Sequence, residues 1–203
     1  MSLDRAKRIK VVLFDVDGVL TDGTIWFFPA STAARSTDTD REQKGDSPGF
    51  GILSQDMIEA KGFNAHDGTA ISLARLGGLK TGMVTKRISE TVALRARDLR
   101  VDFLFQGAEN KSAILDKIVE ASGARAEEIA FVGDDVIDLP VMRRCGLAIA
   151  VANARPQVKQ MAHYQTPSSG GQGAARDAVE FILQAQGKLD RVIDEYIQSR
   201  GGN

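Results

Sequence analysis

The stretch "IKVVLFDVDGVLTDG", residues 9–23, joins an apolar run to three carboxylates, and it decides how the chain folds. Residues 9–14 are almost wholly apolar and do not alternate with polar residues, which is typical of a strand buried on both faces of a parallel sheet. Asp15 and Asp17 follow at once, and Gly18 allows a tight turn behind them. Because functional groups of such sheets collect at the carboxyl ends of the strands, the stretch predicts an acidic site at the end of the first strand.

Four further runs have the same character, and they cover residues 80–85, 101–106, 129–134 and 146–152. Segments with helical spacing of apolar residues lie between the runs, at 69–78, 89–100 and 110–123. Ser89 and Asn110 are candidate N-caps, and Gly123 is a candidate C-terminal stop. Strand alternating with helix predicts an α/β fold with a doubly wound parallel sheet, a Rossmann-like three-layer arrangement.

A region at about 23–65 departs from this alternation. Residues 24–28 and 56–65 resemble two antiparallel strands, and the polar stretch 29–50 between them predicts a mobile loop. The region therefore predicts a projecting β-hairpin with a long tip. The apolar side chains of "WFF" (26–28) have little of their own domain to pack against on a thin hairpin, so we expect them to form a subunit interface.

The C-terminal tail, about 168–203, predicts a flexible turn followed by helices at 174–187 and 189–201. The total of 203 residues predicts one domain, 1–203, and neither the hairpin region nor the tail is large enough for a separate cap domain. A net charge of −1 gives no signal for nucleic acid or a membrane surface. With one cysteine, no apolar run of bilayer length and no signal-peptide core, we expect a cytoplasmic protein.

Polar residues follow several of the predicted strands and should meet at one edge of the sheet. They are Asp15, Asp17, Thr85, Lys111, Asp134, Asp135 and Asp138. Carboxylates this close repel one another unless a cation holds them, and oxygen-only ligands favour a hard cation, most simply Mg²⁺. Asp15, Asp134 and a backbone carbonyl near Asp17 could bind it. Thr85 and Lys111 are then suitable partners for a phosphate.

The motifs "DVDGVLTDG", "VTKR", Lys111 and "GDDVIDLPVM" resemble, in order, the four motifs of the haloacid dehalogenase (HAD)-like phosphatases. The resemblance implies that Asp15 is the nucleophile, that Asp17 is the general acid and then the base, and that Thr85 binds a phosphate oxygen. It implies that Lys111 neutralises charge and that the magnesium ligands include Asp134, with Asp135 and Asp138 in or behind the coordination sphere. Asp at position 17 favours rapid hydrolysis of the aspartyl phosphate, since the related ion pumps carry Thr there.

A closer resemblance, carried by the hairpin, by "FNAHDG" and by the tail "GGQGAARDAVEF", is to the 3-deoxy-D-manno-octulosonate (KDO) 8-phosphate phosphatases. It implies a homotetramer whose hairpins form a central barrel and whose tails can reach neighbouring pockets. The product would be KDO for lipopolysaccharide. The substrate-binding residues implied are Thr85, Lys86, Arg87, His66, Asp67, Gly68 and Arg176. Arg87 matches an arginine that meets the sugar acid carboxylate, which favours the octulosonate over a nine-carbon acid.

The chain departs from that pattern at three places. Lys86 replaces a glycine, His66 stands where Arg or Lys is usual, and loop 29–50 is longer than the usual hairpin turn. Asp22 could form a simple turn with Gly23 or have a further role. Asp138 could cap the helix that begins near Leu139 as well as serve the metal site.

Arg176 could be solvated or could contact an anion. The sequence leaves three alternative functions open: a phosphatase for a nine-carbon 2-keto-3-deoxy acid 9-phosphate, a phospho-accepting receiver domain, and a catalytically idle tetramerisation module. A receiver places its acidic pair on the first strand and its phosphorylated aspartate on the third, unlike "GDDVIDLP" here. An idle module is disfavoured because every catalytic position of the resemblance is filled.

Overall fold

A computed structural model describes residues 2–29 and 57–199 of the chain. The described residues form a parallel sheet of six strands in the order β5-β4-β1-β6-β7-β8. The strands are β1 (Val11–Phe14), β4 (Lys80–Val84), β5 (Phe103–Phe105), β6 (Ile129–Gly133), β7 (Leu147–Ala150) and β8 (Tyr164–Gln165). This sheet confirms the predicted doubly wound α/β fold, with β1 at its centre between β4 and β6.

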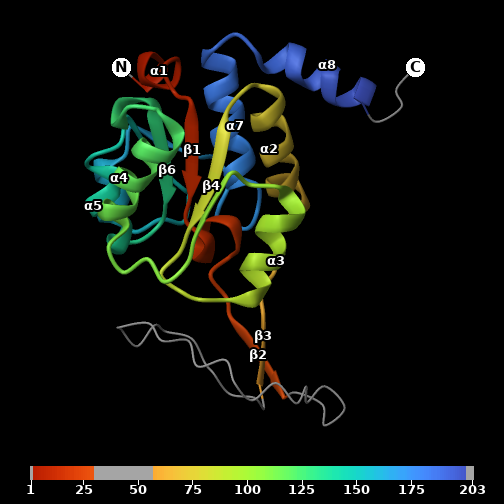
Figure 1. The fold of residues 1–203 in the computed structure, drawn as a ribbon, viewed down its shortest axis with the longest axis vertical. Coiled ribbons are helices and arrows are strands. Elements are labelled where there is room, and N and C mark those ends of the chain that lie inside the picture. The colour runs from red at the N-terminus through yellow and green to blue at the C-terminus, as the bar shows by residue number, and fades with distance from the viewer. Residues whose placement is uncertain (1, 30–56, 200–203) are drawn as a thin grey trace.

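The helices cover both faces of the sheet (Figure 1). Those along the chain are α1 (Ser2–Ala6), α2 (Ala65–Leu76), α3 (Glu90–Leu99), α4 (Lys111–Ser122), α5 (Leu139–Met142), α6 (Pro156–Met161), α7 (Ala174–Ala185) and α8 (Leu189–Ser199). Helices α2, α3 and α7 lie on one face, and α4 and α5 lie on the other. No helix in the described ranges is long and apolar enough to cross a membrane.

The core is centred on β1, whose four residues are all buried, as the unbroken apolar run predicts. Leu13, Phe14 and Phe131 are among its largest fully buried side chains. Burial of one such side chain contributes about 1.5–3 kcal/mol, so the central strands are fixed firmly. Their rigidity holds Asp15, the residue directly after β1, in place.

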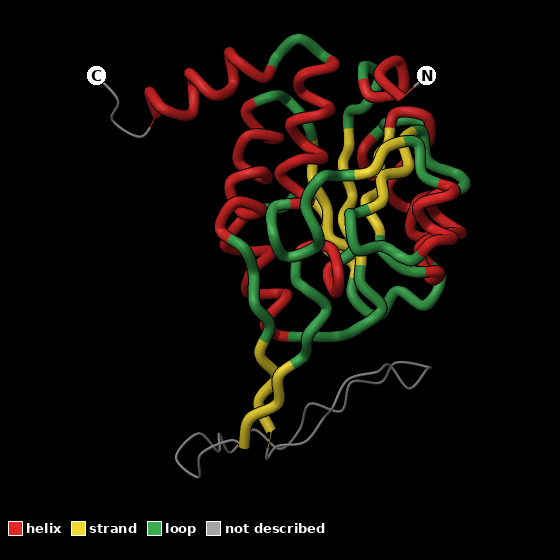
Figure 2. Tube along the Cα trace, turned by 180° about the vertical axis from the view of Figure 1, so that it is seen from behind, coloured by secondary structure: helices red, strands yellow, loops and turns green. Residues whose placement is uncertain are grey.

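The hairpin is formed by β2 (Trp26–Pro29) and β3 (Met57–Ala60), which pair in antiparallel register. It projects from the body at the end opposite to both termini and to α8 (Figure 2). Its apolar side chains, Trp26, Phe27, Phe28, Met57 and Ile58, are exposed, in agreement with the expectation that the hairpin has little of its own domain to pack against. The predicted loop 29–50 falls, apart from Pro29, outside the described residues.

Several element boundaries differ from the predicted ones. Helix α2 begins at Ala65 rather than at residue 69, because the Asn64 side chain accepts a hydrogen bond from the His66 N–H and caps the helix. Strand β3 ends at Ala60, so 61–64 form a connection rather than a strand. The short β8 and α1 were not predicted, since a pair of residues and a polar segment carry little periodic signal.

Candidate active site

Asp15 stands where β1 ends, in a loop that turns tightly away from the sheet. Its backbone N–H donates to the Val132 carbonyl of β6 at 3.0 Å, and its carboxylate accepts from the Val16 N–H at 2.7 Å. Residues Val16–Leu20 form a kinked π-helical turn in which Gly18 has φ of +91°. The predicted tight turn at Gly18 is therefore confirmed, and it fixes the direction of both Asp15 and Asp17.

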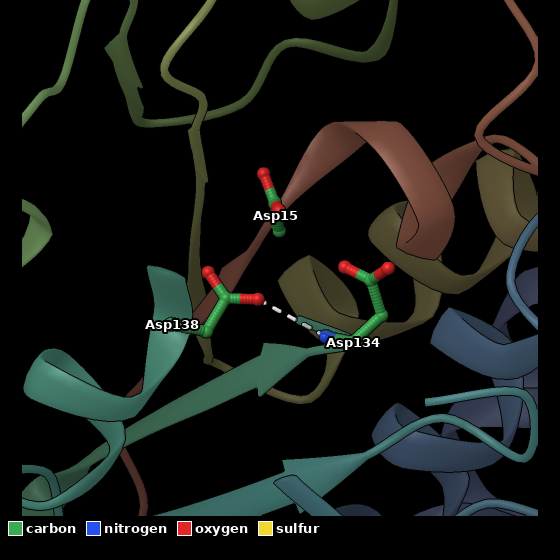
Figure 3. A group of neighbouring side chains, drawn as sticks. All are labelled: Asp15, Asp134 and Asp138. Carbon is green, nitrogen blue, oxygen red and sulfur yellow. Dashed lines mark hydrogen bonds between the residues drawn. The ribbon is translucent and has the colours of Figure 1, made fainter. Parts of the chain in front are cut away.

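Three carboxylates converge beside this loop (Figure 3). One oxygen from each of Asp15, Asp134 and Asp138 lies within 4.8 Å of the others. Burial, and then repulsion from Asp138, raise the pKa of Asp15 to about 8, while Lys111 opposes the rise. Burial, followed by repulsion from Asp138 and Asp135, raises the pKa of Asp134 to about 7.

This donor set suits a divalent cation. Within the described part of the chain, Asp134 Oδ1 is buried without a hydrogen-bond partner. A bound cation would satisfy that oxygen and would offset the repulsion that raises both pKa values. All ligands on offer are oxygens, which favours Mg²⁺ over softer metals.

Lys111, at the start of α4, links two of these carboxylates. Its ammonium lies 2.6 Å from Asp138 Oδ1 and 2.9 Å from Asp15 Oδ1, and all three side chains are buried. Attraction to Asp15 and Asp138 outweighs burial and raises the pKa of Lys111, which therefore stays charged at neutral pH. The second oxygen of Asp138 accepts from the backbone N–H of Asp134 at 3.0 Å. Within the described chain its side chain makes no capping bond to α5, so Asp138 supports Lys111 and the β6 loop rather than capping that helix.

A cavity of about 240 Å³ opens at this edge of the sheet. Its lining residues are Asp15, Asp17, Thr85, Lys86, Arg87, Asp134, Asp135 and Ile137. Thr85 follows β4, and its hydroxyl accepts from the Arg87 N–H at 3.2 Å. Asp135 accepts from the Val136 N–H at 2.7 Å and caps the 3-10 turn Val136–Asp138. The structure thus brings together eight residues, seven of which the sequence analysis assigned to the site.

Four of the predicted substrate-binding residues do not line this cavity. They are His66, Asp67, Gly68 and Arg176. Asp67 is buried and accepts hydrogen bonds from the backbone N–H groups of Gly173, Ala175 and Arg176, at 2.9–3.2 Å. Its carboxylate is thus committed to the N-terminus of α7 in this chain, and its contact with the substrate stays a prediction.

Of the remaining three, two have a structural role in their own part of the fold, and the third shows no role among the described residues. A Cβ atom at Gly68 would lie 2.6 Å from the Arg95 guanidinium, so this glycine leaves room for Arg95 between α2 and α3. Arg176 forms an ion pair with Glu180, one turn further along α7. His66 is exposed at the start of α2.

The tail packs beneath the catalytic loop of its own chain. A Cβ atom at Gly170 would lie 1.7 Å from the Gly18 carbonyl oxygen, and the Gly171 N–H donates to the Val19 carbonyl at 2.9 Å. The Asn64 side chain donates to the Gly171 carbonyl at 3.1 Å. The two motifs "FNAHDG" and "GGQGAARD" therefore contact each other and the loop, which explains Asn64 and the glycines at 170 and 171.

Two residues of the site were missed by the sequence analysis. Lys61, directly after β3, is buried and contacts the Asp17 carboxylate. Glu59 of β3 lies 3.5 Å from Lys61 and 2.9 Å from the Arg87 guanidinium. In the sequence, Glu59 and Lys61 are visible only as two charges in "IEAK" (58–61) at the base of the hairpin. Such charges are ordinary on a solvated strand, so they did not indicate a role in the site. Asp22, in contrast, forms the simple turn that was one of its two expected roles, since it accepts from the Thr24 N–H at 2.8 Å.

Residues 87–176 match the model of the haloacid dehalogenase-like hydrolase family. The 3-deoxy-D-manno-octulosonate 8-phosphate phosphatase of Escherichia coli K12 is 34% identical over 186 residues, which cover 92% of this chain and 85% of that protein. The chain belongs to the KDO 8-phosphate phosphatase family. Its membership of the HAD-like hydrolases makes it an enzyme, and it confirms the resemblance seen in the four motifs.

Solved structures of KDO 8-phosphate phosphatases have the same fold. The enzyme of Moraxella catarrhalis, in complex with magnesium, phosphate and KDO, is 29% identical with a TM-score of 0.79, covering 96% of this chain and 97% of that one. The cobalt-bound enzyme of Haemophilus influenzae is 30% identical with a TM-score of 0.72, covering 91% and 93%. One relative thus binds magnesium and the other cobalt, and the acidic cluster of the present chain fits a metal site of this family.

Proposed function

We propose that this enzyme hydrolyses KDO 8-phosphate to KDO and inorganic phosphate. The observation that carries the proposal is one cavity that joins Asp15, Asp17 and Thr85 to Arg87. The first three can act on a phosphate, and the guanidinium can bind a carboxylate. Among the described residues, the Arg87 Nε is buried and has no hydrogen-bond partner, so a donor is available for such a carboxylate.

The proposed reaction passes through a covalent intermediate. The Asp15 carboxylate attacks phosphorus, the bond from phosphorus to the sugar oxygen breaks, and Asp17 donates a proton to that oxygen. Asp17 then takes a proton from water, which attacks the aspartyl phosphate and releases phosphate. Thr85 binds a phosphoryl oxygen, while Lys111 orients Asp15 and stabilises the negative charge.

The acidic cluster would hold Mg²⁺ through Asp15, Asp134 and the Asp17 carbonyl, with Asp135 and Asp138 supporting the site. The ion supplies charge neutralisation for the phosphoryl group when it is bound. The geometry of Asp138, which is already bonded to Lys111 and to the Asp134 N–H, suits a role behind the ligands.

We further propose that the exposed hairpin assembles the chain into a homotetramer. Trp26 and Phe28 are 57% and 51% exposed. Leaving such large apolar side chains in water is unfavourable, and exposed apolar patches of this kind mark interaction sites. Subunit contacts on the hairpin would bring a neighbouring subunit close to the cavity, because Lys61 directly follows β3 and contacts Asp17 of the cavity lining. We place the reaction in the cytoplasm, because a phosphorylated sugar acid does not cross membranes unaided, and we assign the KDO to lipopolysaccharide synthesis.

A screen of phosphate release over eight- and nine-carbon sugar acid phosphates tests the proposed substrate. KDO 8-phosphate should have the highest kcat/KM and should need Mg²⁺. Preference for a nine-carbon acid would contradict the substrate, and full turnover in EDTA would contradict the metal. Asp15→Asn should abolish phosphate release, while Asp22→Asn, in the same stretch but exposed in a turn, should retain it.

A further inference from the structure

A row of four alternating charges crosses the base of the hairpin. Lys61 contacts the Asp17 carboxylate, lies 3.5 Å from Glu59 Oε1, and has a side chain that is 0% exposed. The other Glu59 oxygen accepts from the Arg87 guanidinium at 2.9 Å. The row therefore runs from Asp17 through Lys61 and Glu59 to Arg87, and its two ends line the cavity.

The middle of the row is fixed to the body of the enzyme. The Thr91 hydroxyl of α3 donates to the Glu59 carbonyl at 3.2 Å, which ties β3 to the helix beside the cavity. Register pairing of Glu59 with Phe27 and of Ala60 with Trp26 holds Glu59 and the residue before Lys61 within the hairpin. Glu59 and Lys61 thus occupy defined positions, although they lie on a projecting element.

Stability alone does not account for this arrangement. A buried ion pair costs much of its attraction in lost hydration, and apolar replacements are often as stable. A row of this kind is expected where it fixes the direction of functional side chains, and here both end members face the cavity.

We propose that Lys61 and Glu59 are positioning residues of this enzyme, Lys61 for Asp17 and Glu59 for Arg87. Lys61 directs the Asp17 carboxyl group toward the oxygen that leaves phosphorus. Glu59 holds the Arg87 guanidinium so that its remaining N–H groups face the substrate carboxylate. The base of the hairpin thereby fixes the side chains that meet the phosphate end and the carboxylate end of the substrate. This inference rests on the proposed function.

Two substrates separate these roles in the holoenzyme with Mg²⁺. KDO 8-phosphate has a carboxylate and an alkoxide leaving group, whereas p-nitrophenyl phosphate lacks the carboxylate and its nitrophenolate leaves without a proton. Glu59→Gln should raise KM for KDO 8-phosphate by about tenfold to a hundredfold, the value of a charge-assisted hydrogen bond, and raise KM for p-nitrophenyl phosphate much less. An equal change with both substrates, or none, would overturn the role of Glu59.

Lys61→Met should lower kcat for KDO 8-phosphate by about tenfold to a hundredfold, and lower kcat for p-nitrophenyl phosphate less. Lys61→Arg keeps the charge and should recover part of the loss. Equal loss with both substrates would overturn the role of Lys61 in directing Asp17 toward the leaving oxygen, because only hydrolysis of the aspartyl phosphate is common to both substrates. No loss would show that Lys61 does not position Asp17. If the melting temperature shows that Lys61→Met does not fold, Lys61→Arg still tests the proposal. Its kcat should fall by a smaller factor, and again more for KDO 8-phosphate than for p-nitrophenyl phosphate.

Matched controls are Glu90→Gln and Lys80→Met, which remove exposed charges of the same kinds outside the cavity. Both should stay within about twofold of wild type. A wild-type enzyme inert toward KDO 8-phosphate would contradict the proposed function instead. The Lys61 comparison would then be made between p-nitrophenyl phosphate and whichever alkyl phosphate the wild type hydrolyses.

Discussion

Gly18 lies so close to Asp134 that a Cβ atom at position 18 would stand 2.2 Å from Asp134 Oδ2. The backbone of Gly18 also has φ of +91°, a conformation that side chains with a Cβ rarely adopt. The catalytic loop and the acidic turn after β6 can therefore approach each other only through glycine. The distance between the nucleophile and the proposed metal ligand depends on this contact.

Gly18→Ala should push Asp134 and the loop apart. We expect kcat to fall by about a hundredfold, as for a displacement of about 1 Å in a catalytic group, and unfolding free energy to fall by about 1–3 kcal/mol. Kinetics and denaturant unfolding measure the two effects. Gly62→Ala is the matched control, since nothing lies within 4 Å of a Cβ atom there. Undiminished kcat in Gly18→Ala would contradict the close contact.

Asp67 should act on stability rather than on substrate affinity. Asp67→Asn weakens three bonds to the N-terminus of α7, so the free energy of unfolding should fall by about 1–3 kcal/mol. KM should stay within about twofold of wild type, because Asp67 does not line the cavity. Asp194→Asn, an exposed acid on α8, serves as control. A raised KM with unchanged stability would instead support the predicted contact of Asp67 with the substrate.

The hairpin should determine the size of the assembly. Sedimentation velocity of the wild type should give a tetramer, and the double variant Trp26→Ser, Phe28→Ser should give smaller species because it removes apolar contact area. Leu94→Ser, an exposed apolar residue on α3, controls for loss of apolar surface elsewhere. A wild type that sediments as a monomer, or a variant of unchanged size, would contradict the proposed interface.

Glu128 should make stability fall at acid pH. Its carboxylate accepts from Lys10 at 2.8 Å and from the Arg125 N–H at 2.9 Å, and these bonds lower its pKa from 4.5 to about 2. A lowered pKa stabilises the folded state above the unfolded value, and this stabilisation is lost as pH falls from 4.5 toward 2. Denaturant midpoints should therefore fall more steeply over that range in the wild type than in Glu128→Gln. Glu120→Gln, exposed on α4, should follow the wild type.

Local patterns were enough to predict the sheet and most of the acidic site. The buried strand before Asp15 and the strand before Asp134 have unbroken apolar runs, and parallel strands bring their ends together by topology alone. The roles of Lys61 and Asp67 could not be predicted in this way. Each depends on a partner far away in the chain, Lys61 on Asp17 and Asp67 on the start of α7, and a charged residue near a turn is ordinarily solvated.

The clasp of Gly170 and Gly171 on the catalytic loop has a consequence for biosynthesis. The ribosome makes Asp15 and Gly18 first, and the backbone on which residues 18–22 rest follows only about 150 residues later. A nascent chain that stops before Gly170 contains every catalytic carboxylate but lacks the support of their loop. Such a chain should therefore be inactive until Gly170 and Gly171 have been added and have folded against the loop.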